Sequence, residues 1–170
     1  MVTICKIGLQ LGLAVTLVVL SLIVLLVSLV APYWNQSPEG EHWGLWQRCV
    51  PETGCEAIDG EPMSGVMQLG RVCVMLCVVG LITVLSLLAV YVCCRRDVRI
   101  ISASIALCFL SMCLTLLSAF LWGSAGNTSL SWCYFLCYLC GLGAAGAGGV
   151  LIYVRRMETF KQMENGGSVV

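Results

Sequence analysis

Four long stretches of the chain consist of apolar and small polar residues, with one amide, Gln10, in the first. None contains a charged side chain, and each is longer than the roughly 20 residues that a helix needs to cross a bilayer. They run from Ile7 to Ala31, Val72 to Cys94, Ile100 to Trp122 and Ser131 to Val154. Helix is the expected form, because backbone polar groups in lipid must be satisfied within the segment. The pattern predicts four membrane-spanning helices, at about residues 7–32, 70–94, 100–122 and 131–154.

The composition supports the same interpretation. Of the 170 residues, 59% are hydrophobic and 11% are charged, which lies outside the usual range for a soluble domain. The first segment is not a typical signal peptide, since its apolar run is longer than an h-region and no A-x-A site follows it. We therefore expect an all-α membrane protein. One left-handed, antiparallel four-transmembrane-helix bundle would occupy residues 1–156, and a cytosolic tail would occupy residues 157–170.

Basic residues fall mainly on one side of the predicted helices. Seven of the nine lie there, namely Lys6, Arg95, Arg96, Arg99, Arg155, Arg156 and Lys161. The positive-inside rule makes this side cytosolic. Both termini of a multi-pass plasma-membrane protein are then inside, and the loops at about residues 33–69 and 123–130 are outside. Trp34, Trp122 and Trp132 lie at the outer ends of helices, which suits an interfacial aromatic belt.

The first outer loop has the features of a small folded element. Alternating positions between His42 and Val50 give a weak strand signal. Pro51 to Gly54 has turn chemistry, and Cys55 to Asp59 would be the returning strand. Such a hairpin would bring Cys49 and Cys55 together, and the oxidising exterior favours a disulfide there. Two free thiols are the alternative.

These features resemble a known family. The matching residues are Trp34, Gly44, Leu45, Trp46, Cys49, Cys55 and Arg71. Except for the arginine, which stands at the outer start of the second helix, they follow the pattern W…GLW…C…C. This pattern is similar to the signature that the claudins share with the epithelial membrane proteins, peripheral myelin protein and the lens fibre membrane protein. The resemblance implies a four-helix membrane domain capped outside by a small disulfide-linked β-hairpin layer.

The resemblance also implies a function in cell–cell contacts. A claudin-like protein would act in cell adhesion or as a paracellular barrier at a tight junction, and would associate with like or related membrane proteins. The short spacing of the two cysteines is closer to the epithelial and lens branch, so an adaptor or auxiliary subunit of another membrane protein is the alternative. An enzyme is disfavoured, because no catalytic, cofactor or metal motif is visible and His42 is the single histidine. The basic residues lie at membrane edges, which does not suggest nucleic acid.

Most acidic residues lie in the first outer loop. They are Glu39, Glu41, Glu52, Glu56, Asp59 and Glu61. The resemblance to claudins implies that the residues just beyond the second cysteine form the charged lining of a paracellular path. Glu56 and Asp59 are therefore candidate pore charges that would attract cations. A solvated acidic loop is the alternative.

Three further features are candidate sites of modification or binding. Cys93 and Cys94 lie at the cytosolic edge of the second helix, where S-palmitoylation occurs, although interior packing is the alternative. Asn127 begins an N-glycosylation sequon in the second outer loop. A hydroxyl at the third-last position and an apolar carboxyl terminus suit strand addition to the groove of a cytosolic PDZ scaffold. The residues of this tail motif are Ser168, Val169 and Val170.

Overall fold

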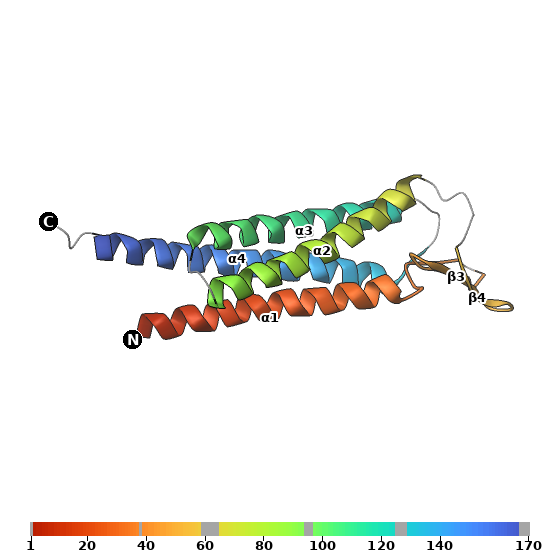
Figure 1. Cartoon of the computed structure of the whole chain (residues 1–170). Helices are drawn as coiled ribbons and strands as arrows, with labels where there is room; N and C mark the ends of the chain where they lie inside the picture. The colour runs from red at the N-terminus through yellow and green to blue at the C-terminus, as the bar shows by residue number, and fades with distance from the viewer. Residues whose placement is uncertain (1, 38, 59–64, 94–96, 125–128, 167–170) are drawn as a thin grey trace.

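Four long helices form one bundle in the computed structural model, which describes residues 2–37, 39–58, 65–93, 97–124 and 129–166. The helices are α1 (Val2–Val30), α2 (Gly65–Cys93), α3 (Val98–Ser124) and α4 (Trp132–Gly166). Both termini lie at one end of the bundle and the strands lie at the other (Figure 1). By length and composition all four helices are able to cross a membrane. The predicted four long apolar helices are therefore confirmed.

Helix packing is closest along three of the interfaces. α1 packs on α4, α2 on α3, and α3 on α4, whereas α1 and α2 make a smaller contact. Small residues permit this approach: a Cβ atom at Gly141 would lie 2.6 Å from Oγ1 of Thr115, and one at Gly143 would overlap the hydroxyl of Ser21. Close backbone approach through small residues is typical of helices in lipid, where no hydrophobic force draws helices together.

Buried hydroxyl groups join the helices by hydrogen bonds. Ser28 of α1 donates to the carbonyl oxygen of Cys133 at 3.0 Å, and Ser118 of α3 donates to the carbonyl oxygen of Gly70 at 3.0 Å. In an apolar interior such bonds satisfy groups that would otherwise be costly to bury. Six cysteines of the described residues are buried and contribute to the same packed interior, namely Cys73, Cys77, Cys108, Cys133, Cys137 and Cys140.

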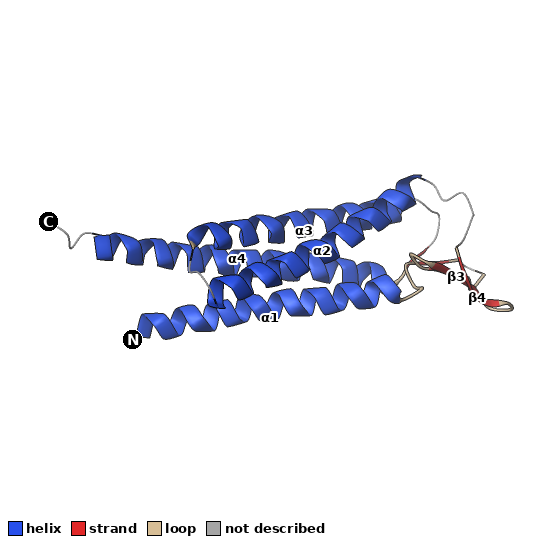
Figure 2. Cartoon of the chain, viewed as in Figure 1, coloured by secondary structure: helices blue, strands red, loops and turns tan. Residues whose placement is uncertain are grey.

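The strands form one small antiparallel sheet at the end of the bundle opposite the termini (Figure 2). The order across this sheet is β4-β3-β2-β1-β5. Their bounds are β1 Asn35–Gln36, β2 His42–Trp43, β3 Gln47–Val50, β4 Gly54–Ala57 and β5 Ser129–Leu130. We call this sheet and its described connecting residues, 33–37, 39–58 and 129–131, the cap. The predicted disulfide-linked hairpin is confirmed as β3 and β4.

The strand expected from His42 to Val50 is wrong as a single element. The chain reverses within it, since the backbone N–H of Gly44 donates to the carbonyl oxygen of Gln47 at 2.9 Å. β2 and β3 are therefore two strands that pair with each other, with Trp43 opposite Arg48. The second outer loop also enters the sheet, because β5 pairs with β1. The sequence pattern did not indicate either feature.

Candidate functional site: the cap and its anchors

Trp34 fixes the cap to the ends of two helices. Its side chain is fully buried, and its indole N–H donates to the carbonyl oxygen of Ser28 on α1 at 2.7 Å. Its ring lies 5.5 Å from the ring of Trp122 on α3, and its backbone N–H donates to the carbonyl oxygen of Trp43 at 2.9 Å. Buried aromatic pairs of this kind are worth about 0.5–1.5 kcal/mol beyond their burial. One side chain thus links α1, α3 and β2.

The expected interfacial position is wrong for Trp34 and Trp122, which are buried against each other inside the protein. Trp132 is 47% exposed, and its interfacial position stays a prediction. The burial of Trp122 depends on a small neighbour, because a Cβ atom at Gly70 of α2 would lie 2.6 Å from its indole nitrogen. Sequence reasoning missed Gly70, since a glycine within an apolar run has no distinctive local signal.

The three residues Gly44, Leu45 and Trp46 turn the chain back onto the helices. A Cβ atom at Gly44 would lie 2.6 Å from Cα of Pro32, a backbone atom that cannot move aside. Leu45 is fully buried at the end of the bundle, and Trp46 is 45% exposed. The requirement for glycine is therefore steric, and the following leucine adds apolar area to the junction between cap and bundle.

Arg71 of α2 lies against Trp46. Its guanidinium carbon is 5.1 Å from the centre of the Trp46 ring, a cation–π distance. Its Nε and Nη2 atoms are buried and have no hydrogen-bond partner among the residues that the structure describes. Asp59 and Glu61, two acidic residues that precede Arg71 in the first outer loop, lie outside those residues. This contact joins α2 to Trp46 of the cap.

Arg48 organises the charges of the cap. It forms an ion pair with Glu41, with 2.9 Å between nitrogen and oxygen, and its guanidinium carbon lies 4.3 Å from the centre of the Trp43 ring. In the sheet Arg48 also stands directly opposite Glu56. Neither the ion pair nor the ring contact was predicted, although opposite charges in so short a loop were the available signal. Arg48 therefore offsets part of the negative charge of this loop.

Cys49 and Cys55 are joined in a disulfide across the β3–β4 hairpin. They stand opposite each other in the sheet, and their Cα atoms are 3.9 Å apart. Gly54 has a φ of +89°, which favours glycine and follows the three-residue turn. All four residues of β4 are exposed, and β4 is an edge of the sheet. The hairpin is thus fixed by the disulfide, and no other described strand pairs with the outer edge of β4.

The other predicted sites are placed as follows. Glu56 is exposed on β4, and Cys93 is exposed at the last residue of α2. Six predicted site residues lie outside the part of the chain that the structure describes: Asp59, Cys94, Asn127, Ser168, Val169 and Val170.

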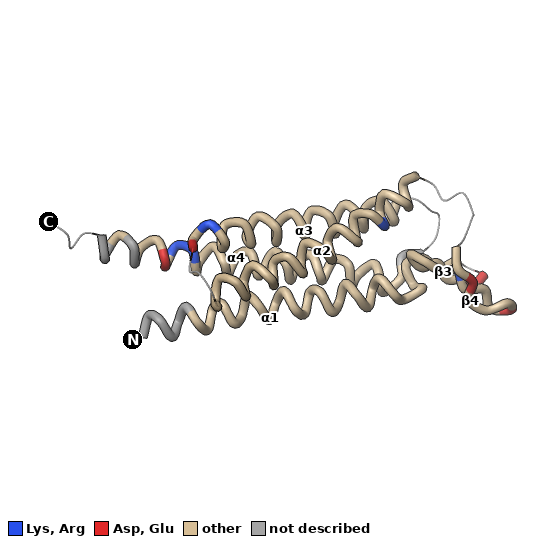
Figure 3. Tube along the Cα trace, viewed as in Figure 1, with Lys and Arg blue, Asp and Glu red and all other residues tan. Residues whose placement is uncertain are grey.

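The two ends of the molecule differ in charge. Most charged residues of the cap are acidic, and basic residues gather at the opposite end of the bundle, near the termini and beside Asp97 and Glu158 (Figure 3). The acidic residues of the cap are Glu39, Glu41, Glu52 and Glu56, and the described basic residues at the other end are Arg99, Arg155 and Arg156. This separation agrees with the expected membrane placement of the helices.

Comparisons with known proteins leave the family open. No family model matches the chain. No curated protein matches it either.

Proposed function

We propose that this protein is a claudin-like structural membrane protein of cell–cell contacts, and that the cap is its contact surface. The observation that carries this proposal is the disulfide-linked β3–β4 hairpin with its exposed strand β4, which projects from a cap anchored on the bundle by Trp34 and Leu45. A pinned surface loses little conformational entropy when it binds, which favours contact between proteins.

The open edge of β4 gives this surface a binding mode. Edge strands present unpaired backbone N–H and C=O groups to any extended chain that approaches. The exposed side chains of β4 would remain accessible to the partner. The proposed partners are copies of this chain or related membrane proteins, in the same membrane or in the opposed one.

The proposal places the protein in the plasma membrane with both termini in the cytosol. This orientation is supported by the separation of acidic and basic residues. Ser168, Val169 and Val170 would then reach a cytosolic PDZ scaffold. An epitope inserted in the turn from Ser37 to Glu41 should be labelled on intact cells, and an N-terminal epitope only after permeabilisation. The reverse pattern would overturn the orientation.

Imaging in adherent cells tests the contact function. An N-terminally tagged copy, which leaves the tail free, should concentrate where two expressing cells touch. Borders between an expressing and a non-expressing cell serve as the internal control and should show less protein. An even distribution over the whole cell surface would contradict the proposal.

The alternative is an adaptor or auxiliary subunit of another membrane protein. It is favoured by the use of the second outer loop inside the sheet, where β5 pairs with β1. This leaves the β3–β4 hairpin as the main projecting element among the described residues. In that case the tagged protein should co-purify with one membrane protein from single, non-touching cells, and cell contact should not change its distribution.

A further inference from the structure

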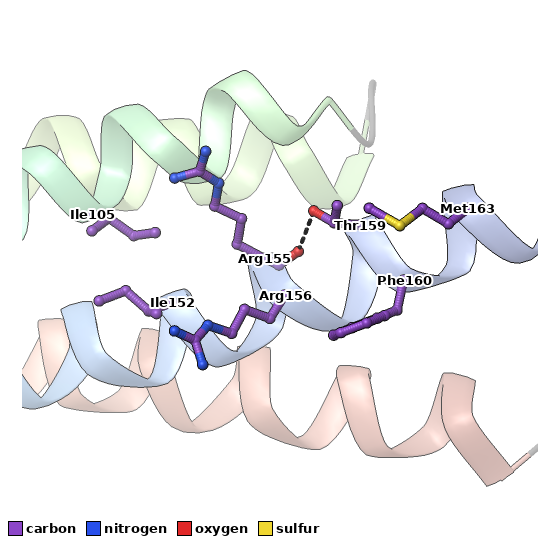
Figure 4. Close-up of a pocket in the computed structure, with 7 residues that line it drawn as sticks. All are labelled: Ile105, Ile152, Arg155, Arg156, Thr159, Phe160 and Met163. Atoms are coloured by element: carbon purple, nitrogen blue, oxygen red, sulfur yellow. Dashed lines mark hydrogen bonds between the residues drawn. The ribbon is translucent and has the colours of Figure 1, made fainter.

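A cavity opens between α3 and α4 at the end of the bundle that holds the termini. It has a volume of about 610 Å³, within the range of small-molecule sites in proteins. Its lining combines two arginines with apolar side chains: Ile105, Ile152, Arg155, Arg156, Phe160 and Met163. Ile105 belongs to α3 and the others to α4 (Figure 4).

The two arginines are exposed, and none of the described residues serves as their counter-ion. Among the described residues, no carboxylate lies within ion-pair distance of Arg155 or Arg156. Figure 4 shows both side chains directed back along α4, toward Ile105 and Ile152. The charge-free run of α4 ends at Val154, directly before the two arginines. In a membrane that covers this run, both guanidinium groups would lie at the edge of the hydrocarbon region. A cation at this depth is stabilised by an anion of the membrane itself.

Thr159 completes the polar part of the lining. Its hydroxyl donates to the carbonyl oxygen of Arg155 at 3.0 Å, so its proton is already used and its oxygen remains an acceptor. The donors available to a ligand are therefore the two guanidinium groups. Each guanidinium group matches the geometry of phosphate, to which arginine forms charge-assisted bidentate hydrogen bonds.

We propose that this cavity binds one anionic glycerophospholipid from the surrounding leaflet. Arg155 and Arg156 hold its phosphate and acidic headgroup, and an acyl chain lies along Ile105 and Ile152. A phospholipid fits better than a soluble phosphate, because apolar side chains form most of the lining and the cavity lies beside the hydrocarbon region. The proposal requires only that the helices span a membrane, and it is independent of the contact function.

Native mass spectrometry of the purified full chain tests the proposal. The protein in neutral detergent is titrated with dihexanoyl phosphatidylserine, with dihexanoyl phosphatidylcholine, and with glycerophosphoserine, which has the headgroup but no acyl chains. We expect one retained phosphatidylserine, with weaker retention of the other two. Replacing both arginines, Arg155→Gln with Arg156→Gln, should weaken phosphatidylserine binding about tenfold or more.

Arg99→Gln is the matched control. Arg99 is exposed at the same end of the bundle but does not line the cavity, and its loss should change binding less than about twofold. Ile152→Trp, which fills the apolar side without changing charge, should also weaken retention of phosphatidylserine. Equal losses for Arg99→Gln and the double variant would show diffuse attraction and overturn the proposal. If glycerophosphoserine binds as well as phosphatidylserine, the ligand is not a phospholipid, and the site binds a soluble phosphate instead.

Discussion

The two ends of the molecule use arginine side chains in different ways. At the end that holds the cap, Arg48 of the cap and Arg71 of α2 contact protein groups. These are the rings of Trp43 and Trp46 and, for Arg48, the carboxylate of Glu41. At the other end, Arg155 and Arg156 line an open cavity and have no carboxylate partner among the described residues.

This difference distinguishes arginines that stabilise the fold from arginines that are available to bind a ligand. An arginine that packs on a tryptophan contributes to the folded state, and its removal should change stability. An arginine that faces a cavity contributes little until a ligand arrives, and its removal should change affinity. The predictions below test the cap side of this comparison, from the largest expected effect to the smallest.

Trp34→Ala should have the largest effect. The change removes a fully buried side chain, its hydrogen bond to Ser28 and its contact with Trp122. Truncation of a buried Trp costs about 3–5 kcal/mol. The variant should unfold at a markedly lower temperature in detergent and be retained inside cells. Trp132→Ala is the matched control: its side chain is 47% exposed, and we expect a loss below about 1 kcal/mol. Equal losses would remove Trp34 as an anchor.

Loss of the disulfide should have the second largest effect. Closing so short a loop stabilises by about 2 kcal/mol in the chain-entropy model. Cys49→Ser with Cys55→Ser should therefore lower the unfolding temperature and reduce delivery to the cell surface. Cys113→Ser, at a free and exposed cysteine of α3, should change neither. Unchanged surface delivery and stability in the double variant would show that the hairpin does not need its bridge.

The features that were predicted from the sequence depend on local chemistry. Four charge-free runs specify long helices without reference to partners, and the turn from Pro51 to Gly54 places Cys49 opposite Cys55. Both features depend on residues that are close together in the chain. The structure contains them because no contact with a distant segment favours a different conformation.

The features that were missed depend on contacts between distant segments. β5 pairs with β1 although the two are far apart in the chain, and two-residue strands leave no alternation to detect. The reversal at Gly44 depends on the backbone of Pro32, and the burial of Trp122 depends on the missing Cβ of Gly70. A sequence shows that a glycine is present, but only the fold shows what it makes room for.

The contact between Arg71 and Trp46 should give a smaller, coupled effect. Cation–π pairs are worth about 0.5–2 kcal/mol. Arg71→Gln and Trp46→Leu should each lower stability, and the double variant should lose less than the sum of the two. A double-mutant cycle of unfolding free energies measures this coupling. Arg99→Gln combined with Trp46→Leu is the matched control and should be additive. Additivity for Arg71 as well would mean that the contact contributes nothing.

The smallest effect on the fold, and the most specific one on function, is expected at Glu56. Its side chain is exposed on the edge strand next to Cys55, so its replacement should leave stability within about 0.5 kcal/mol. If the protein lines a paracellular path, a fixed carboxylate there favours cations over anions. Expression in an epithelial monolayer should then raise the sodium-to-chloride permeability ratio in dilution-potential measurements, and Glu56→Lys should weaken or reverse that preference.

The position of Arg48 sharpens this last prediction. Because Arg48 stands opposite Glu56 and pairs with Glu41, the wild-type field at this point is already partly offset. Glu56→Lys would place two positive charges side by side, so it should act more strongly than Glu52→Lys, the same change in the exposed turn of the hairpin. Equal effects of the two variants would indicate a diffuse acidic surface. No change in the permeability ratio on expression of the wild-type protein, at normal surface levels, would exclude the pore and favour the adaptor.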